Sequence, residues 1–299
     1  MEKLKNRLEI FKKKYWKLLK ILITISLFLI IILKVDLVKS IKLFKEVNLF
    51  IFIPLFLYIP ALLISTIKWK ISLDNKEDLW PLFKIYWISG FFSNFLPSTI
   101  GGDSYKVLKL RKKIGVKNVL ESVIFDRFSG VLGLIIFCAI FSKIIFKTTN
   151  NFYLSFFSIF LLIGIIVFII IVTLLDKNSF KIINYLKNIL KKFYRKSLYL
   201  ILLSFCFLTL GAISLWVYYF MFGYKINFLI ILSFYCLIQI INMLPISING
   251  WGIREGLSIY LFSLIGIPME ISLSISLISR LILFIQTGLG GIIYANTKN

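Results

Sequence analysis

The chain has 299 residues, 59% of them hydrophobic, and a formal net charge of +23. Its mean hydropathy of +0.92 and its apolar runs of about twenty residues exclude an ordinary soluble domain. The chain contains no histidine, which excludes histidine-based acid–base catalysis and histidine–metal sites. Its three cysteines stand in apolar runs without metal-ligand spacing. We therefore predict an all-α integral membrane protein that needs no metal and no cofactor.

The first elements along the chain are a basic stretch and an apolar span. Residues 1–17 place leucine and aromatic side chains among lysines, which predicts an amphipathic helix at the inner membrane surface. Six apolar runs are long enough to cross a bilayer as full helical spans. They cover about residues 18–35, 47–67, 119–142, 152–175, 198–221 and 271–294.

Two further apolar segments, 81–105 and 226–267, are interrupted by residues that break helices. Proline removes a backbone donor and glycine lowers helix stability, so we expect each segment to form a re-entrant helical hairpin whose break lies inside protein. We expect the asparagines three residues before the prolines to bond the carbonyl groups that proline leaves free. The predicted break residues are Asn94, Pro97, Gly101 and Gly102 in the first segment, and Asn242, Pro245, Gly250 and Gly252 in the second.

The two breaks align with each other at a constant offset of 148 residues, with Asn, Leu, Pro and Gly recurring at matching places. Lys106 then falls opposite Arg254, and a few inserted residues bring Arg127 opposite Arg280. Because the flanking hydropathy also repeats, we predict an internal repeat. Broken hydrophobic segments at corresponding positions of two halves are typical of a transporter-like binding site.

Basic residues set the predicted orientation. The strongest basic blocks, 1–20, 106–117 and 176–197, should lie on the cytoplasmic side. This requirement is met if both termini are cytoplasmic and the hairpins enter from opposite faces, as in an inverted repeat of halves 1–148 and 149–299. One basic loop before the second span is then left outside, and full spans in place of the hairpins remain an alternative.

Ionisable side chains at membrane depth normally face protein or water and mark function. Asp103 is interpreted either as a contact for a cation or polar headgroup, or as the N-cap of a following helix. Arg254 suits phosphate recognition, and Glu255 beside it is interpreted as a counter-ion, a partner for another arginine or a proton acceptor. Arg280 has no acid nearby in sequence, so we expect Glu255 or Asp103 to pair with it. Arg127 is interpreted as its counterpart, or as a side chain that extends to the headgroup level.

We expect the two hairpins to bring these charges together near the membrane midplane, around a polar cavity. Charges can stay ionised there only if they are paired or wet, and arginine can hold a phosphate through two bonds at once. No nucleophile–base pair, phosphate loop or nucleotide motif accompanies them, so we assign no catalytic residue. The predicted lipid-binding residues are Asp103, Lys106, Arg127, Arg254, Glu255 and Arg280.

Several short motifs are more specific together than any one of them alone. They are Asn94-Phe95-Leu96-Pro97 with Gly102-Asp103, Asp126-Arg127, Leu244-Pro245, Gly250, Gly252-Ile253-Arg254-Glu255-Gly256, and Arg280. From about residue 15 to 295, the chain resembles the membrane domain of the lysylphosphatidylglycerol synthase family. That domain is the flippase-like part of the multiple peptide resistance factor and of its stand-alone relatives. Lys106 stands where relatives often carry arginine.

The resemblance implies an integral plasma-membrane protein that moves or handles lipids. In full-length family members, a separate soluble domain transfers lysine from its tRNA to phosphatidylglycerol. We expect no such domain and no such transfer here, so the name phosphatidylglycerol lysyltransferase would rest on similarity alone.

The main prediction is a lipid flippase-like protein that handles an anionic or aminoacylated phospholipid, or a polyprenyl-phosphate lipid. The alternative is an accessory scaffold that presents such a lipid to a separate synthase or glycosyltransferase. A third interpretation is an intramembrane enzyme that uses Asp103 or Glu255 as acid or base. The expected partners are membrane lipids with anionic headgroups and not nucleic acid, because the basic loops adjoin apolar spans.

Overall fold

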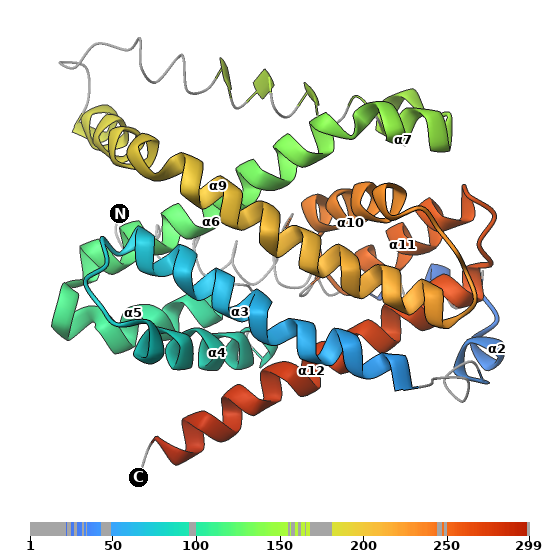
Figure 1. The fold of residues 1–299 in the computed structure, drawn as a ribbon, viewed down its shortest axis with the longest axis horizontal. Coiled ribbons are helices and arrows are strands. Elements are labelled where there is room, and N and C mark those ends of the chain that lie inside the picture. Colours follow the sequence, from blue (N-terminus) through green and yellow to red (C-terminus); the bar gives the residue numbers. More distant parts are fainter. Residues whose placement is uncertain are drawn as a thin grey trace, which may run out of the picture.

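The computed structural model describes the chain from residue 22 to residue 297, with gaps. For residues 181–190, and for a few others inside helices, the backbone alone is described. Every regular element in this part is a helix (Figure 1). The described residues are 22, 25–26, 29–31, 33, 35–42, 49–95, 100–154, 156, 159–160, 163–164, 166–167, 181–243, 247 and 250–297.

The helices follow one order twice: a long helix, two short ones, and another long one. The first set is α3 to α6 and the second is α9 to α12. The bounds are α2 Leu37–Lys42, the 3-10 helix η2 Leu49–Ile51, α3 Phe52–Ser72, α4 Leu79–Phe95, α5 Ile100–Ile114, α6 Val116–Ile140, α7 Ser142–Thr149, α9 Lys181–Met221, α10 Phe228–Met243, α11 Ile253–Ser263 and α12 Met269–Asn296.

Within the described residues, four helical segments are long and apolar enough to cross a membrane. They are Leu49–Ser72, Val116–Ile140, Tyr194–Met221 and Met269–Asn296. They confirm the second, third, fifth and sixth predicted spans, and the chain is a multi-pass membrane protein. The predicted spans at 18–35 and 152–175 lie largely outside the described residues, and the amphipathic stretch at 1–17 lies wholly outside them.

The basic segment before the fifth span is helical as well. Helix α9 runs without interruption for 41 residues, so most of the lysine-rich stretch and the apolar span that follows it form one helix. Lysine and leucine are strong helix formers, and no proline interrupts α9. The span predicted from hydropathy therefore begins inside a longer element.

The two short-helix pairs lie toward opposite ends of the molecule, α4–α5 at one end and α10–α11 at the other (Figure 1). Helix α9 packs against α3, α6 and α10, and helix α12 packs against both α4 and α11. The main core includes the fully buried aromatic side chains of Tyr219, Phe234 and Phe262. Because α12 contacts both pairs, it links the two regions where the sequence predicted functional residues.

Candidate functional site

The segment predicted to form the first hairpin folds as two packed helices, α4 and α5, and we call this pair the first hairpin. Its glycines do not separate the two helices. Gly101 and Gly102 both lie in the first turn of α5. A Cβ atom on Gly102 would lie 2.4 Å from the carbonyl oxygen of Ser89 and 2.2 Å from the hydroxyl of Ser93. Gly102 therefore lets α5 approach α4 closely, which is a packing role. Pro97 lies outside the described residues.

We predict that Gly102→Ala destabilises the protein by about 1–3 kcal/mol, the usual cost of overpacking, because the backbone of α4 must shift. Gly256→Ala is the matched control, since Gly256 is also helical and a Cβ there meets nothing within 4 Å. It should be neutral or slightly stabilising, because alanine favours helix. Thermal unfolding in detergent measures both, and equal midpoints for the two variants would contradict the packing role.

The segment predicted to form the second hairpin folds as the helix pair α10–α11, which we call the second hairpin, and here the glycines do lie between the two helices. Gly250 has φ +72° and Gly252 has φ +81°, a region that favours glycine. A Cβ on Gly250 would lie 1.6 Å from the side-chain oxygen of Asn242 in the last turn of α10. Pro245 lies outside the described residues.

Asn94 ties the first hairpin to a distant helix. It lies near the end of α4, and its Nδ2 donates to the hydroxyl of Thr287 on α12 at 2.6 Å. Nearby, Trp87 Nε1 donates to the carbonyl oxygen of Gln286 at 2.8 Å. The sequence predicted only a local role for Asn94 beside Pro97, so this long-range bond is new.

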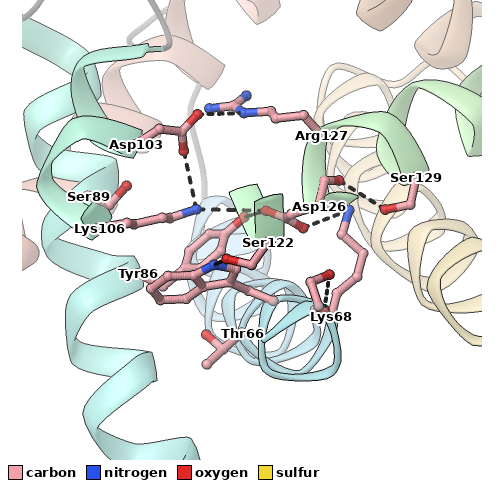
Figure 2. A network of polar contacts seen from close by, with 12 residues as sticks. Thr66, Lys68, Tyr86, Ser89, Asp103, Lys106, Ser122, Asp126, Arg127 and Ser129 are labelled. Atoms are coloured by element: carbon pink, nitrogen blue, oxygen red, sulfur yellow. Dashed lines mark hydrogen bonds and ion pairs between the residues drawn. The ribbon is translucent and has the colours of Figure 1, made fainter. Parts of the chain in front are cut away.

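Five charged side chains from α3, α5 and α6 form a network that we call the first charge cluster (Figure 2). Asp103 accepts a bond from Arg127 Nε at 2.9 Å and lies 3.4 Å from Lys106 Nζ. Asp126 lies 3.7 Å from Lys106 Nζ and 3.2 Å from Lys68 Nζ. Cations and carboxylates thus alternate through the interior.

Aromatic rings surround the centre of the first charge cluster. The ammonium group of Lys106 lies 3.7 Å from the ring centre of Tyr86 and 5.0 Å from that of Trp69, a cation–π arrangement. The Tyr86 hydroxyl donates to Asp126 at 3.1 Å, and Trp69 Nε1 donates to the Ser122 hydroxyl at 3.1 Å. The two rings therefore line the centre of the cluster, and the Tyr86 hydroxyl helps to hold Asp126 in place.

The first charge cluster is accessible at one end only. The Arg127 side chain is 42% exposed, whereas those of Lys106 and Asp126 are 3% and 4% exposed. Asp103 lies inside α5 and its carboxylate is held by Arg127, so the N-cap interpretation of Asp103 is wrong. Arg127 is therefore the most exposed member of the first charge cluster.

A second charge cluster joins α11 to α12. Glu255 is fully buried; its Oε1 accepts from Arg280 Nε at 2.7 Å and its Oε2 accepts from the Gly252 N–H at 2.7 Å. Arg254 Nη2 donates to the Ser279 hydroxyl at 2.8 Å. The expected partnership between Arg280 and Glu255 is therefore present.

Each hairpin thus contributes one carboxylate that binds the Nε of an arginine on the following long helix. The residues are 24 positions apart in Asp103–Arg127 and 25 apart in Glu255–Arg280. The environments differ, because the Arg280 side chain is only 13% exposed and its guanidinium lies 4.2 Å from the ring centre of Trp251. The contacts described above group the charges into two clusters, where the sequence predicted one.

Sequence reasoning missed Lys68, Tyr86 and Ser279. Lys68 stood just past the predicted second span, where a lysine usually faces water. A signal was present nearby, because Ser65 and Ser72 mark a small polar stripe on the same helix, and α3 buries them both. Such a stripe indicates a protein-facing side. Nothing in the local sequence pointed to Tyr86 or Ser279.

The two clusters suit an anion better than a metal ion. The first contains three cations and two carboxylates, and the second contains two arginines and one carboxylate, so each carries an excess positive charge. In the described part of the chain, no group of three or more Asp, Glu, Cys or His side chains could hold a metal ion. Arginine presents a planar fork of donors that matches phosphate and carboxylate.

Comparison with known protein families gives a match over most of the chain. The family described as "Lysylphosphatidylglycerol synthase TM region" matches residues 17–291, which is nearly the whole chain. No curated protein matches the chain.

Proposed function

The chain belongs to the lysylphosphatidylglycerol synthase transmembrane family, and on that premise we propose that it moves an anionic lipid between membrane leaflets. One observation carries the proposal: Arg127 is partly exposed at the edge of a buried cluster that has an excess of positive charge. Such a site attracts a phosphate group, while the acyl chains of the lipid stay in the bilayer. An anionic or aminoacylated phospholipid and a polyprenyl phosphate all carry the required group.

Asp103 orients the arginine for this task. Its bond to Arg127 Nε fixes the plane of the guanidinium. A guanidinium has five N–H donors in a planar fork, a geometry that matches the oxygens of a phosphate. Lys106, 3.4 Å from the same carboxylate, keeps Asp103 paired if the arginine moves toward a headgroup.

We further propose that the two hairpins are re-entrant and form an inverted repeat of halves 1–148 and 149–299, in the plasma membrane with both termini cytoplasmic. The repeated order of long and short helices supports this arrangement, as does one carboxylate–arginine pair per hairpin. The second charge cluster, with Arg254, Glu255 and Arg280, would then be the counterpart of the first on the opposite face. Helix α12 contacts both hairpins and can couple them.

Reconstituted vesicles test the proposal. The rate at which fluorescent phosphatidylglycerol changes leaflets should be well above that of empty vesicles. Phosphatidylcholine should move more slowly, because its choline partly offsets the phosphate charge. Equal rates with and without protein would reject translocation. If the purified protein then still carried bound anionic lipid by native mass spectrometry, the scaffold alternative would replace it.

A further inference from the structure

Lys106 is the least well paired cation of the first charge cluster. It is 2% exposed, and its ion pairs to Asp103 and Asp126 are long, at 3.4 and 3.7 Å. Lys68 has a shorter ion pair with Asp126, at 3.2 Å, and a hydroxyl partner in Ser204. A buried ammonium with weak partners loses much of the hydration that stabilises its charge.

The first charge cluster is not electrically neutral when all of its members are ionised. The ion pairs of the first charge cluster join three cations to two carboxylates, an excess of one positive charge. An uncompensated charge in a buried site is costly. The cluster can become neutral by binding a monoanion or by releasing one proton. Arginine does not release its proton in proteins, so the choice falls on a lysine.

The groups that face the Lys106 ammonium come from every helix around it. Its neighbours favour the charged form through two carboxylates and two aromatic faces, and oppose it through burial and the Arg127 guanidinium. They are Asp103 on its own helix α5, Tyr86 on α4, Trp69 on α3, and Asp126 and Arg127 on α6. Lys68 on α3 is paired with Asp126 at 3.2 Å. Occupation of the site by an anion would add a third negative charge and favour the ammonium.

We propose that Lys106 is a proton-binding site linked to the headgroup at Arg127, so that the protein takes up a proton together with an anionic lipid. This inference rests on the proposed function. In the empty cluster, Lys106 gives one proton to water and becomes a neutral amine. When a phosphodiester binds at Arg127, the Lys106 amine takes one proton back from water. The cluster is neutral in both states, and the lipid and its proton travel together.

The linkage has a definite sign. Below the pH at which Lys106 titrates in the empty cluster, the ammonium is already present and binding takes up no proton. Above that pH, each headgroup takes up about one proton, and affinity falls by up to about tenfold per pH unit. A proton gradient would then drive the lipid toward the leaflet on the alkaline side, where the proton is released.

Calorimetry of the full chain in detergent tests the linkage. Dihexanoyl phosphatidylglycerol is titrated in two buffers of different ionisation enthalpy, because the difference in heat gives the protons taken up. The wild type should take up about one proton per lipid above the titration range. Lys106→Arg should bind lipid with no proton uptake and with an affinity that hardly depends on pH. Lys112→Gln, which removes an exposed lysine of the same helix, should behave as the wild type.

Three results would overturn the linkage, and they are distinguishable. Wild-type binding without proton uptake at any pH would reject it and leave the proposed function intact. Uptake that persists in Lys106→Arg would place the proton elsewhere. Absence of lipid binding by the wild type would reject the proposed function and the linkage together. Lys106→Gln is a second variant in case Lys106→Arg fails to fold. It too should abolish proton uptake, and it should weaken lipid binding.

Discussion

Arg127→Gln should strongly slow lipid movement and leave the fold intact. The side chain is 42% exposed, so its removal opens no cavity in the core. Its carboxylate partner Asp103 keeps Lys106 as a neighbour, 3.4 Å away, and is not left without a cation. Glutamine loses the charge and the fork that hold phosphate, a loss of about 1.5–3 kcal/mol and therefore roughly ten- to hundredfold in rate.

The leaflet assay with fluorescent phosphatidylglycerol measures this effect. Arg127→Lys keeps the charge but not the fork and should retain part of the rate. Lys112→Gln removes an exposed charge of the basic segment and should retain the full rate. A wild-type rate in Arg127→Gln, in protein that unfolds at the wild-type temperature, would remove Arg127 from the pathway.

Glu255→Gln should destabilise the protein by about 3–5 kcal/mol, the cost of breaking a buried ion pair from one side. Glu255 is fully buried, and its loss of charge leaves the Arg280 guanidinium, 13% exposed, without its carboxylate. Glutamine has nearly the same shape and retains an oxygen for the Gly252 N–H. The substitution therefore isolates the charge from the packing.

Unfolding in mixed detergent micelles measures this difference in free energy. Glu255→Gln combined with Arg280→Gln should recover part of the loss, because the Arg280 guanidinium is then no longer left without its carboxylate. Glu270→Gln, at the partly exposed start of α12, is the matched control and should cost less than about 1 kcal/mol. If Glu255→Gln and Glu270→Gln cost the same, the pair does not hold α11 to α12.

The two carboxylate–arginine pairs are similar in form but are expected to have different roles. In the Asp103–Arg127 pair, the arginine side chain is partly exposed, which suits exchange of the carboxylate for a ligand. Glu255–Arg280 is closed by burial, by the Gly252 N–H and by the Trp251 ring, which suits a fixed joint. A repeat whose halves have diverged in this way would let one hairpin bind the headgroup while the other holds the helix that both contact.

The sequence by itself determined the class of protein, four of the spans and the two interrupted apolar segments that form short helix pairs. Hydropathy and helix-breaking residues act locally, so a window of about twenty residues contains the information. The sequence also identified Arg280 as a residue that needs a distant acid. No acid lies near it in the chain, and a charge at that depth needs a partner. Glu255 was one of two acids available at similar depth.

Only the tertiary structure decided which charges meet. Lys68 and Tyr86 join the first charge cluster because α3 and α4 pack beside α5 and α6, and no local pattern encodes that packing. The sequence showed Gly102 as a break, whereas the contact with Ser89 that makes glycine necessary arises only when two helices touch. Side-chain partnerships across helices depend on distances between residues far apart in the chain, and the folded arrangement alone sets them.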